Sequence, residues 1–378
     1  MTGIPTRVFT LALALSFSCA VGAVAEASAE LRASAWLPPW AQGEATDTVS
    51  SQPNLFSEAS PFWFYTDEEG RIQSSPGARD AGVSERLRSA GIDEIPSVTA
   101  PIGPEEAIHL LGSPRLRQRH VRRIVDLARP YAGIDFDYEH PALTTDRSTA
   151  KRVRDAFNSF FPQVCRALAR HDRKCVVTVM PRTEAKPEVW RGKLMPWVYD
   201  YRTIGQVADR VRVMAYDQHA GSYGPGPVAG APWVNRVAHF SSQTMPARKV
   251  ELGIPLYGRR WSQSSRGTVK EIGASRERIG WSGPAKLAGG TELSSVTWDQ
   301  AQSLRRGCGA KTIWSRHEKE ATFRCSGQVT WFANAKSALV RARIARRHEL
   351  GGVAFWAPYG EDPDTWGKLR RSGLFGRG

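Results

Sequence analysis

The chain has 378 residues, of which 41% are hydrophobic, and it carries a formal net charge of +15 at neutral pH. At this length it can bury a large core. Length alone suggests two or three domains, although α/β barrels use it as one. The 52 Lys and Arg residues are spread along the chain without a recognition motif, which disfavours nucleic-acid binding.

The amino-terminal segment is typical of a secretory signal peptide. It begins with Arg7, continues through the apolar or small residues 8–24, and reaches small-x-small cleavage sequences that end at Ala25 and Ala29. A membrane anchor is the alternative, but the strictly apolar part is short and polar residues interrupt it. Lipid attachment at Cys19 has weak support, because the residues before it form a poor lipobox. The pattern therefore predicts export.

Export would leave a mature chain of residues 30–378 that is secreted or held in the cell envelope. No other segment is long and apolar enough to span a bilayer. In that setting the net charge of +15 would permit electrostatic association with anionic cell-wall polymers. The favoured interpretation is an Arg-rich composition that serves solubility alone.

Strand-like and helix-like segments alternate after residue 30. Eight apolar runs are predicted as strands: Ala33–Trp40, Pro61–Tyr65, Glu94–Val98, Gly133–Glu139, Cys175–Met180, Arg210–Tyr216, Val250–Tyr257 and Gly352–Trp356. Between them, helices are predicted from Pro114 to Arg129, from Ser148 onward, and near 334–347. This alternation predicts a parallel (β/α)8 TIM barrel.

The interval from about 259 to 330 is too long for one helix. It contains β-prone pieces at 268–272 and 328–332, and a helix start at Thr297, whose capping box closes with Gln300. We expect a small α+β insertion there, between barrel strands seven and eight.

Four cysteines remain once the signal peptide is removed: Cys165, Cys175, Cys308 and Cys325. An even number in an exported chain indicates disulfides, and pairing Cys165 with Cys175 and Cys308 with Cys325 is the simplest of three connectivities. A zinc site is not expected, because no Cys-x-x-Cys spacing or His cluster accompanies them. We predict neither a metal nor a cofactor.

The most informative segment is 132–139, where Asp135, Asp137 and Glu139 alternate with bulky apolar residues. In a strand these acids share one face. Crowding carboxylates on a buried face is costly unless some are protonated or hydrogen-bonded, so such a row indicates chemistry. A solvent-facing strand is disfavoured by the apolar flanks. A Ca²⁺ or Mg²⁺ site is the other alternative.

These residues resemble the Asp-Gly-x-Asp-x-Asp-x-Glu signature of family 18 glycoside hydrolases, the chitinase family, with Ala132 in place of the leading Asp. The run 214–217 is similar to that family's Met-x-Tyr-Asp motif. The runs 252–258 and 351–356 also look like the family, and they are closest to its bacterial branch of spore-cortex and cell-wall enzymes. Because Ala132 lies an odd number of residues from Glu139, it belongs to the opposite face of an unbroken strand. We therefore expect its change to alter support without removing the acid.

The resemblance implies a catalytic barrel that acts on glycans containing N-acetylglucosamine. Glu139 would serve as acid and then base, and Asp137 would stabilise the oxazolinium formed by the substrate's own N-acetyl group. Asp135 would order Asp137 by a hydrogen bond rather than contact the substrate. Tyr216 and Asp217 would hold the acetamido group, and the product would retain its configuration.

Aromatic residues near the strand ends are candidates for sugar binding, although each could equally be a packing residue. The candidate substrate contacts are Trp356, Met214, Trp36, Trp40, Tyr257 and, in the loop 221–230, Tyr223. A lectin-like protein that binds glycans without cleaving them is the alternative function. The intact Glu139 favours catalysis, and a monomer is expected.

Overall fold

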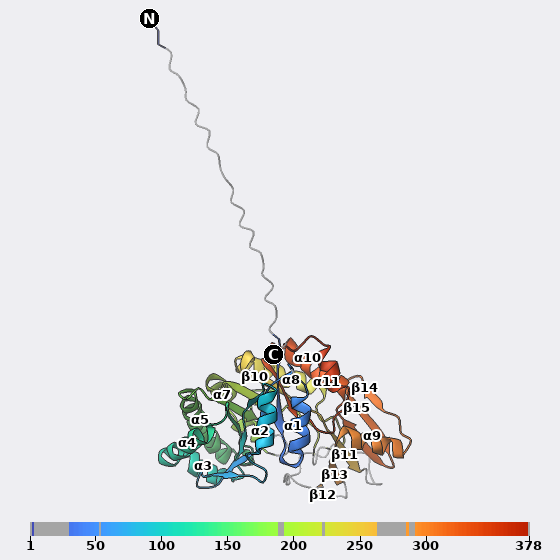
Figure 1. Ribbon diagram of the computed structural model, residues 1–378, viewed down its shortest axis with the longest axis horizontal. Coiled ribbons are helices and arrows are strands. Elements are labelled where there is room, and N and C mark those ends of the chain that lie inside the picture. The colour runs from blue at the N-terminus through green and yellow to red at the C-terminus, as the bar shows by residue number, and fades with distance from the viewer. Residues whose placement is uncertain are drawn as a thin grey trace.

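The structure is a computed structural model that describes residues 2–3, 30–52, 54–187, 193–220, 224–262, 285–286 and 292–376. Most of the expected signal peptide lies outside these residues, and so do Tyr223 and the β-prone piece at 268–272. Helices surround a central barrel, and a second sheet with α9 flanks the barrel on one side (Figure 1).

A closed, mainly parallel sheet forms the centre of the fold. Its strands are β1 (Arg32–Leu37), β2 (Phe56–Pro61), β3 (Phe64–Thr66), β4 (Ile72–Ser74), β5 (Asp93–Glu94), β6 (Ser97–Thr99), β7 (Gly133–Asp137), β8 (Lys174–Val179), β9 (Arg210–Val213), β10 (Val250–Pro255) and β17 (Gly352–Trp356). In this 11-stranded sheet β17 pairs with both β10 and β1, and β2 pairs with both β1 and β5. The strand β2 leads directly into β3, and β5 into β6, so each of these two pairs occupies one barrel position. The strand β4 is only an antiparallel neighbour of β3 and occupies none. The sheet therefore has eight barrel positions. The predicted (β/α)8 barrel is confirmed.

Two predicted strands differ from the observed ones because of proline. Single strands were expected at 61–65 and 94–98, but each position consists of two short strands. Pro61 ends β2 and Pro96 separates β5 from β6, since proline has no N–H to donate to a ladder. The carbonyl of Pro96 still accepts the N–H of Asp135 at 3.1 Å, so the barrel wall continues across the break.

Several other strands end earlier than predicted, among them β1, which ends at Leu37 rather than Trp40. The strand β7 ends at Asp137 rather than Glu139, and β9 ends at Val213 rather than Tyr216. Tyr138 and Tyr216, which follow these ladders, are 1% and 8% exposed. The apolar pattern therefore continues beyond the last paired residue, because burial at the barrel mouth does not require strand pairing.

The helices that cover the barrel follow the predicted alternation. They are α1 (Gln42–Ser50), α2 (Ala81–Ser89), α3 (Pro104–Gly112), α4 (Pro114–Ala128), α5 (Arg147–Ala169), α6 (Met195–Val198), α7 (Tyr201–Val207), α8 (Ala231–Thr244), α10 (Ala335–Arg347) and α11 (Thr365–Arg370), with 3-10 turns η1 (Pro39–Ala41), η2 (His140–Ala142) and η4 (Ala247–Lys249). The helix α4 starts at Pro114, as predicted, and ends at Ala128, one residue before the predicted end at Arg129. The helix α10 starts after Asn334, whose side chain accepts the backbone N–H of Ser337 at 2.9 Å.

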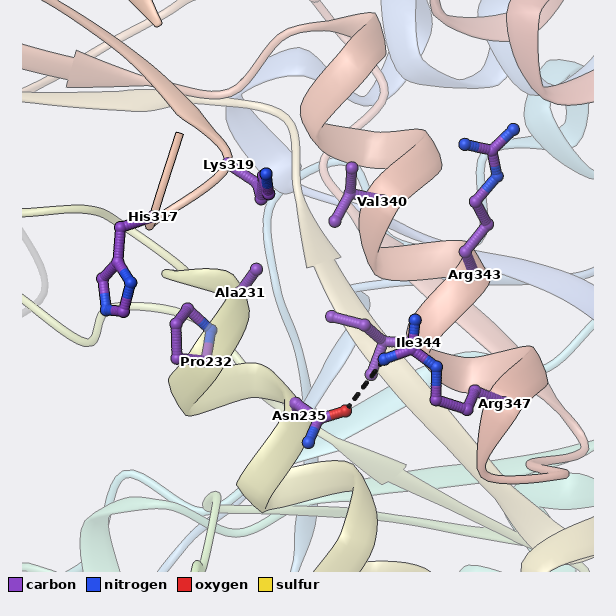
Figure 2. Close-up of a pocket in the computed structure, with 9 residues that line it drawn as sticks. All are labelled: Ala231, Pro232, Asn235, His317, Lys319, Val340, Arg343, Ile344 and Arg347. Atoms are coloured by element: carbon purple, nitrogen blue, oxygen red, sulfur yellow. Dashed lines mark hydrogen bonds between the residues drawn. The ribbon is translucent and has the colours of Figure 1, made fainter. Parts of the chain in front are cut away.

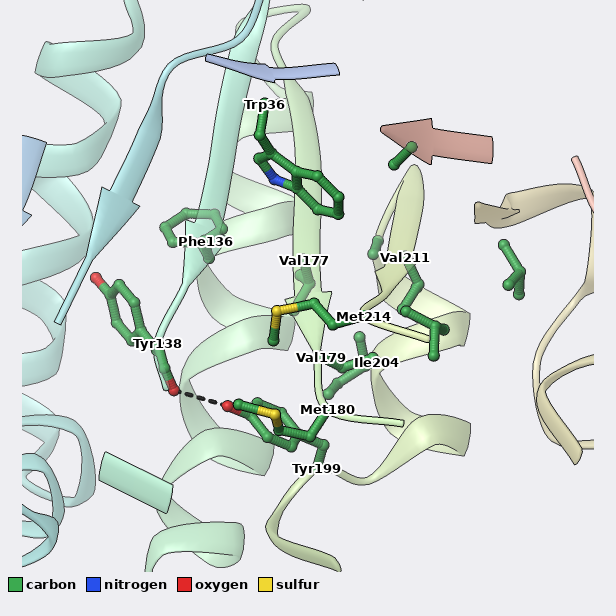
Figure 3. Packing of buried hydrophobic residues seen from close by; sticks show 14 of the residues in the cluster. Trp36, Phe136, Tyr138, Val177, Val179, Met180, Tyr199, Ile204, Val211 and Met214 are labelled. Atoms are coloured by element: carbon green, nitrogen blue, oxygen red, sulfur yellow. Dashed lines mark hydrogen bonds between the residues drawn. The ribbon is translucent and has the colours of Figure 1, made fainter. Parts of the chain in front are cut away.

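The outward faces of the barrel strands form an apolar layer with the helices. Phe136, Val177 and Val211 are 0% exposed and lie in one buried cluster with Ile204 of α7 (Figure 3). Since side chains alternate along a strand, the residues between them point into the barrel. Packing outside the barrel thus fixes which polar residues lie inside.

His120 of α4 is a buried histidine behind the acidic strand. Its Nδ1 lies 2.9 Å from the carbonyl oxygen of Gly70, and its Nε2 lies 2.8 Å from the Tyr138 hydroxyl. Because a carbonyl can only accept, Nδ1 donates, and the neutral ring can then accept the tyrosine proton at Nε2. Burial lowers the pKa of His120 to about 4, so the ring is neutral at physiological pH.

This histidine should make the fold sensitive to acid. Its folded pKa of about 4 lies below the ordinary value of 6.5, so its contribution is complete above pH 6.5 and is lost as the pH falls toward 4. We expect a loss of roughly 3 kcal/mol in the free energy of unfolding across this window. Urea unfolding of His120→Gln should show a weaker pH dependence than the wild type, and an equal dependence in both would contradict the assignment.

The interval between β10 and β17 contains the expected α+β insertion. Its elements are β11 (Gly258–Ser262), β12 (Ala285–Lys286), β13 (Glu292–Val296), α9 (Trp298–Gly307), β14 (Ile313–Ser315), β15 (Glu320–Cys325) and β16 (Gln328–Phe332), and the strands form a six-stranded antiparallel sheet. The predicted capping box is present, with the backbone N–H of Gln300 donating to Thr297 Oγ1 at 3.2 Å. A small core of Val296, Phe323 and Phe332 stabilises the sheet against α9.

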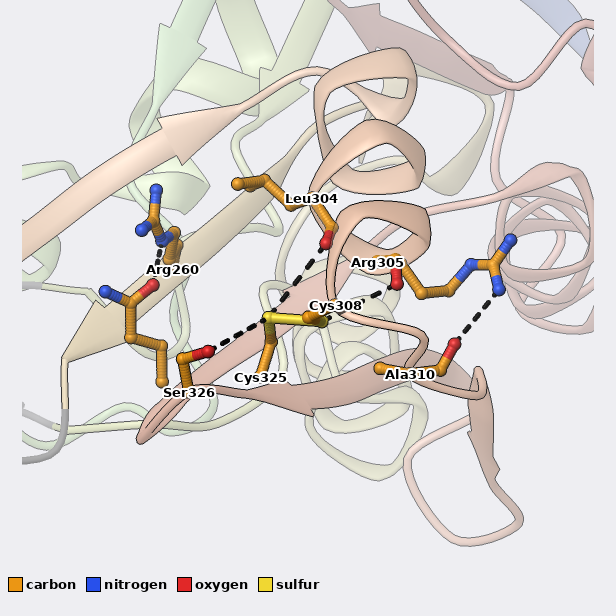
Figure 4. Close-up of a disulfide and its surroundings, with 8 residues drawn as sticks. Arg260, Leu304, Arg305, Cys308, Ala310, Cys325 and Ser326 are labelled. Carbon is orange, nitrogen blue, oxygen red and sulfur yellow. Dashed lines mark hydrogen bonds between the residues drawn. A yellow bond between two sulfur atoms is a disulfide. The ribbon is translucent and has the colours of Figure 1, made fainter.

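Two disulfides join neighbouring elements. Cys165 of α5 is bonded to Cys175 of β8, and Cys308, just after α9, is bonded to Cys325 of β15 (Figure 4). These are the local pairings that were simplest among the three possible connectivities. Each bond closes a short stretch of chain, the first across the barrel wall and the second within the insertion.

A buried ion pair connects the insertion to the barrel. Glu320 of β15 and Arg341 of α10 are 0% and 1% exposed, and Nη2 of Arg341 lies 2.8 Å from Oε2 of Glu320. The same carboxylate accepts the backbone N–H groups of Val228 and Ala229 at 2.7 and 3.1 Å. The pair therefore holds the segment between β9 and α8 against the insertion. None of the described helices is long and apolar enough to cross a membrane.

Candidate active site

The inside of the barrel is unusually polar. Barrel interiors are commonly filled by branched apolar residues, but inward positions here carry Ser34, Ser60, Ser97, Thr178 and Arg212, all between 0% and 2% exposed. The small serines leave space for the Arg212 guanidinium, whose Nη1 donates to Ser60 Oγ at 2.6 Å. Polar groups therefore extend from inside the barrel up to the acidic row.

Asp135 is held by donors from four strands. Its Oδ2 accepts Trp36 Nε1 at 2.9 Å, Ser97 Oγ at 2.9 Å and Arg212 Nη1 at 3.2 Å, and its Oδ1 accepts Thr178 Oγ1 at 2.8 Å. The side chain is 0% exposed. It is therefore a fixed, inaccessible carboxylate that supports the row from inside.

Asp137 lies one inward position closer to the mouth and is 5% exposed. Burial, and then the charges of Glu139 and Asp135, raise its pKa well above the usual value for an aspartate. Its Oδ1 is buried without a hydrogen-bond partner among the described residues. The expected hydrogen bond from Asp135 to Asp137 is not found within this part of the chain, because the oxygens of Asp135 already accept other donors.

Glu139 lies beyond the end of β7, in a helical backbone conformation with φ −82° and ψ −46°. It is half-buried, whereas Tyr138 beside it is buried. The carbonyl of Tyr138 accepts the Tyr199 hydroxyl at 2.9 Å, which fixes this turn (Figure 3). The charge of Glu139 helps raise the pKa of Asp137 and of Tyr216, so these groups lie close enough to interact.

The tyrosine and aspartate that follow β9 lie at the same mouth. Tyr216 is 8% exposed, and burial, followed by the neighbouring Tyr257 and then by nearby carboxylates, raises its hydroxyl pKa well above the usual value. Asp217 has a φ of +59°. Its Oδ1 accepts the Tyr257 hydroxyl and also Nε of Arg259 at 2.6 Å. Burial by itself lowers the pKa of Arg259. The negative charge of Asp217 acts in the opposite direction, and the net result is a raised pKa.

Gly253 of β10 makes the position of Tyr216 possible. A Cβ at Gly253 would lie 2.9 Å from Cε1 of Tyr216 and 2.6 Å from the carbonyl oxygen of Val213. Real Cβ atoms do not approach other atoms so closely, so a side chain here would displace the tyrosine. The glycine in the run 252–258 thus has a specific steric role.

Aromatic rings surround the acids. Trp356 contacts Trp36, Trp40 and Phe62 with centroid distances of 6.2, 6.0 and 5.3 Å in edge-on geometry. It is half-buried, and Trp40 is 56% exposed with its indole N–H donating to the Tyr359 hydroxyl at 2.9 Å. These rings give the mouth an apolar wall of the kind that sugars stack on.

The structure separates the predicted sugar contacts into two groups. Trp356, Trp40 and Tyr257 keep accessible surface at the mouth. Trp36 is 1% exposed and Met214 is 8% exposed, and both lie in the buried core (Figure 3). Trp36 therefore acts on Asp135 through its N–H rather than offering a free face to sugar.

Ala132 lies before β7 rather than in it. Its N–H donates to the Glu94 carbonyl at 3.0 Å, and its carbonyl accepts the N–H of Lys174 at 2.9 Å. The alternation rule applies only within a strand, so the expectation that Ala132 belongs to the opposite face does not describe this residue. Its contribution is backbone pairing between neighbouring strands.

Several residues of the site were not singled out from the sequence: Arg212, Arg259, Tyr199, Phe62 and Tyr359. Arg259 lies two residues after Tyr257, at the beginning of the expected insertion, and it was assigned to that unit. Arg212 shares the inward alternation of β9 with Met214, a signal that could have identified it.

The donor set at the acidic row does not suit a metal ion. The oxygens of Asp135 are occupied by hydrogen bonds, and the Arg212 guanidinium already supplies a positive charge at 3.2 Å. A raised pKa at Asp137 also favours a neutral carboxyl group over an anionic ligand.

A parallel barrel with an acidic pair at the carboxyl ends of its strands, walled by aromatic rings, defines a glycosidase of the barrel class. Residues 102–361 match the family described as glycosyl hydrolases family 18, and the chain belongs to that family. The resemblance noted at the acidic row is thereby confirmed.

Relatives include enzymes of spore cortex and chitin. The chain is 26% identical over 276 residues to the uncharacterised Bacillus subtilis glycosylase YvbX, covering 70% of this chain and 69% of that one. It is 23% identical over 264 residues to the Bacillus subtilis cortical fragment-lytic enzyme, with 68% of this chain aligned to 54% of that protein, about half its length.

Solved structures share the fold. A chitinase from Chromobacterium violaceum superposes with a TM-score of 0.74 at 21% identity, covering 91% of this chain and 99% of that one. The Bacillus cereus spore cortex-lytic enzyme SleL superposes with a TM-score of 0.72 at 18% identity, covering 91% and 74%. These likenesses support the barrel architecture.

Proposed function

We propose that the protein is an exported glycosidase that cleaves β-linkages after N-acetylhexosamine with retention of configuration. The observation that carries this proposal is the buried Asp137, whose pKa is raised, next to Glu139 at the barrel mouth. Two neighbouring carboxyl groups that cannot both ionise readily retain a proton near neutral pH. A proton held there is available to a glycosidic oxygen.

We assign a distinct role to each group. Glu139, which is half-buried at the mouth, protonates the leaving oxygen while the substrate's acetamido oxygen attacks the anomeric carbon. Asp137 then stabilises the positive ring that forms. Glu139 next accepts a proton from water, which opens this ring, and the two displacements together retain the configuration.

The acetamido group would be held by the residues after β9. Tyr216 has a raised pKa and therefore keeps its proton, so its hydroxyl can donate to the acetamido oxygen. Asp217 is oriented by Arg259 and Tyr257, which both donate to its Oδ1. Trp356 and the exposed Trp40 would stack on sugar rings next to the cleaved bond.

The substrate class is tested by product analysis on chitin oligomers and purified peptidoglycan side by side. We expect mass spectrometry to show new reducing ends at N-acetylhexosamine on at least one of them, and NMR to show the β-anomer first. An inverted anomer would contradict substrate assistance. Binding to both glycans without any product would instead support the lectin-like function.

A second surface is suited to anionic envelope polymers. A hollow between α8 and α10, beside the turn before β15, is bordered by basic residues around an apolar floor (Figure 2). The basic side chains are His317, Lys319, Arg343 and Arg347, and none of the described lining residues is acidic. We propose that this hollow contributes to wall association, because clustered cations attract polyanions over several ångströms.

Cosedimentation with cell walls tests this association. The pair Arg343→Glu and Arg347→Glu should reduce binding to walls that carry anionic polymers, and added salt should weaken wild-type binding in the same way. The matched control reverses two exposed arginines of α4, Arg115→Glu and Arg122→Glu, which changes the net charge equally. Equal loss in both pairs would show that only total charge matters.

A further inference from the structure

Glu320 begins β15 of the insertion, but its carboxylate lies at the start of α8 in the barrel. Its Oε1 and Oε2 accept the backbone N–H groups of Val228 and Ala229 at 2.7 and 3.1 Å. Arg341 of α10 lies 2.8 Å from Oε2 and also donates to the Ala229 carbonyl. Hydrogen bonds to charged groups are roughly twice as strong as those between neutral groups. The backbone at 228–229 is therefore fixed to the insertion.

This backbone is paired in turn with the residue that follows Asp217. The N–H of Gln218 donates to the Val228 carbonyl at 2.9 Å, and Oε1 of the Gln218 side chain accepts the N–H of Gly230 at 2.8 Å. Two hydrogen bonds and one peptide bond thus lead from the Glu320 carboxylate to the backbone of Asp217. This route does not pass through the barrel strands.

The insertion holds Asp217 from a second side as well. The Oδ1 atom of Asp217 accepts the Tyr257 hydroxyl and Nε of Arg259, the latter at 2.6 Å. Arg259 lies in β11, which pairs with β16, and β16 pairs with β15. The backbone of Asp217 has a φ of +59°, a conformation that is uncommon for residues with a side chain and persists where the surrounding structure imposes it. One sheet therefore holds both the side chain and the backbone of this residue.

The core of the insertion does not need the carboxylate of Glu320. Ala321 and Phe323 pack in that core, and because side chains alternate along a strand, Glu320 points to the opposite face of β15. Glu320 and Arg341 are 0% and 1% exposed. Buried ion pairs often add no more stability than apolar residues of similar volume. The specific consequence of this pair is therefore the fixed backbone at 228–229.

We propose that Glu320 is a positioning residue that holds the turn 216–217 in the orientation an acetamido group requires, by way of the backbone at 228–229. The inference rests on the proposed function and deepens it, because it extends the determinants of the glycan site into the insertion. The acidic row is held separately, since Asp135 is bonded to residues of the barrel strands. Loss of the Glu320 carboxylate should therefore disturb the turn and leave the acidic row in place.

Replacing Glu320 with glutamine tests this role in turnover. The amide nitrogen of Glu320→Gln cannot accept an N–H, so one of the two backbone groups at 228–229 loses its acceptor. A misplaced acetamido group attacks the anomeric carbon more slowly, so kcat on a fluorogenic chitobioside should fall roughly 10-fold. The value of KM should stay within about twofold of the wild type, because the aromatic wall is unchanged.

Phe323→Leu provides the matched control. It removes packing from the same strand, β15, but leaves the carboxylate of Glu320 and its partners unchanged. The free energy of unfolding should fall in this variant, as in Glu320→Gln, whereas kcat and KM should equal those of the wild type. An equal loss of kcat in both variants would indicate a merely structural role and would overturn the proposal.

Amide hydrogen exchange follows the turn without any turnover. The N–H of Gln218 belongs to the turn, and the N–H of Asp135 belongs to the barrel wall. In Glu320→Gln, mass spectrometry should show exchange that is faster by roughly 10-fold at Gln218 and unchanged at Asp135. In Phe323→Leu both amides should exchange as in the wild type. Unchanged exchange at Gln218 in Glu320→Gln would overturn the proposed role.

A second variant tests the same turn if Glu320→Gln yields too little folded protein. Gln218→Met removes the acceptor of the Gly230 N–H and leaves the buried ion pair intact. It should show the same selective loss of kcat and the same faster exchange at position 218, and wild-type values of both would overturn the assignment. If the wild type cleaves no glycan but the variants show the expected exchange, only the proposed function fails, because the insertion still holds the turn.

Discussion

Replacing Glu139 with glutamine should lower turnover of N-acetylglucosamine oligomers on the order of 1,000-fold, because the side chain that donates the proton is lost while its shape is kept. Binding of the same oligomers should change little, since the aromatic wall and the residues after β9 are untouched. The measurement is kcat on a fluorogenic chitobioside, together with calorimetric binding of a chitin oligomer.

The pH dependence provides an internal check on this result. Residual activity of Glu139→Gln should lose the alkaline limb that reports the acid, whereas Glu94→Gln should retain both limbs and full activity. Turnover equal to the wild type in Glu139→Gln would remove this glutamate from the mechanism. Loss of oligomer binding along with turnover would assign it to substrate binding instead.

The fold was predictable because its signals are local and repeated. Short Val- and Ile-rich runs alternate with amphipathic segments, and most helix starts carry a proline or a polar cap, as at Pro114 and Asn334. Strand boundaries were less predictable where buried residues continue beyond the last residue that pairs with a neighbouring strand. Tyr138 and Tyr216 are buried beyond the ends of β7 and β9, so their apolar character extended the predicted strands.

The candidate site was only partly predictable, for a physical reason. The members of the acidic row are consecutive alternating residues, and a single segment therefore reveals them. Arg212 reaches Glu58 across 154 sequence positions and Asp135 across 77, and no local pattern encodes such contacts. Trp36 was a candidate for sugar contact because it lies near the end of a predicted strand, but its N–H donates to Asp135 and its ring is buried.

These long-range contacts also change the explanation for the raised pKa in the acidic row. A row of three acids on one strand suggests mutual repulsion as the source of a raised pKa. In the barrel, Asp135 is compensated by Arg212, and burial is the leading cause of the shift at Asp137, ahead of the charges of Glu139 and Asp135. Contacts with other strands thus distinguish Asp135 from Asp137 and Glu139, the two acids assigned to catalysis.

The buried ion pair between the insertion and the barrel should dominate the stability of the described fold. Arg341→Met is expected to lower the free energy of unfolding by about 3–5 kcal/mol, because Glu320 would keep a buried charge without its cation. Arg341 also donates to the Ala229 and Lys319 carbonyls, so the segment after β9 would lose its anchor. Denaturant unfolding monitored by tryptophan fluorescence measures this change.

The double variant Arg341→Met with Glu320→Leu distinguishes loss of packing from an unpaired charge. Removing both charges should recover much of the stability lost in Arg341→Met, although the Val228 and Ala229 N–H groups then lose their acceptor. A surface pair such as Arg152 and Glu105, at 2.9 Å, offers the matched control. Its removal should cost at most about 1 kcal/mol, because solvent screens exposed ion pairs. Equal losses of unfolding free energy at the two sites would show that burial does not determine how strongly the ion pair between Glu320 and Arg341 stabilises the fold.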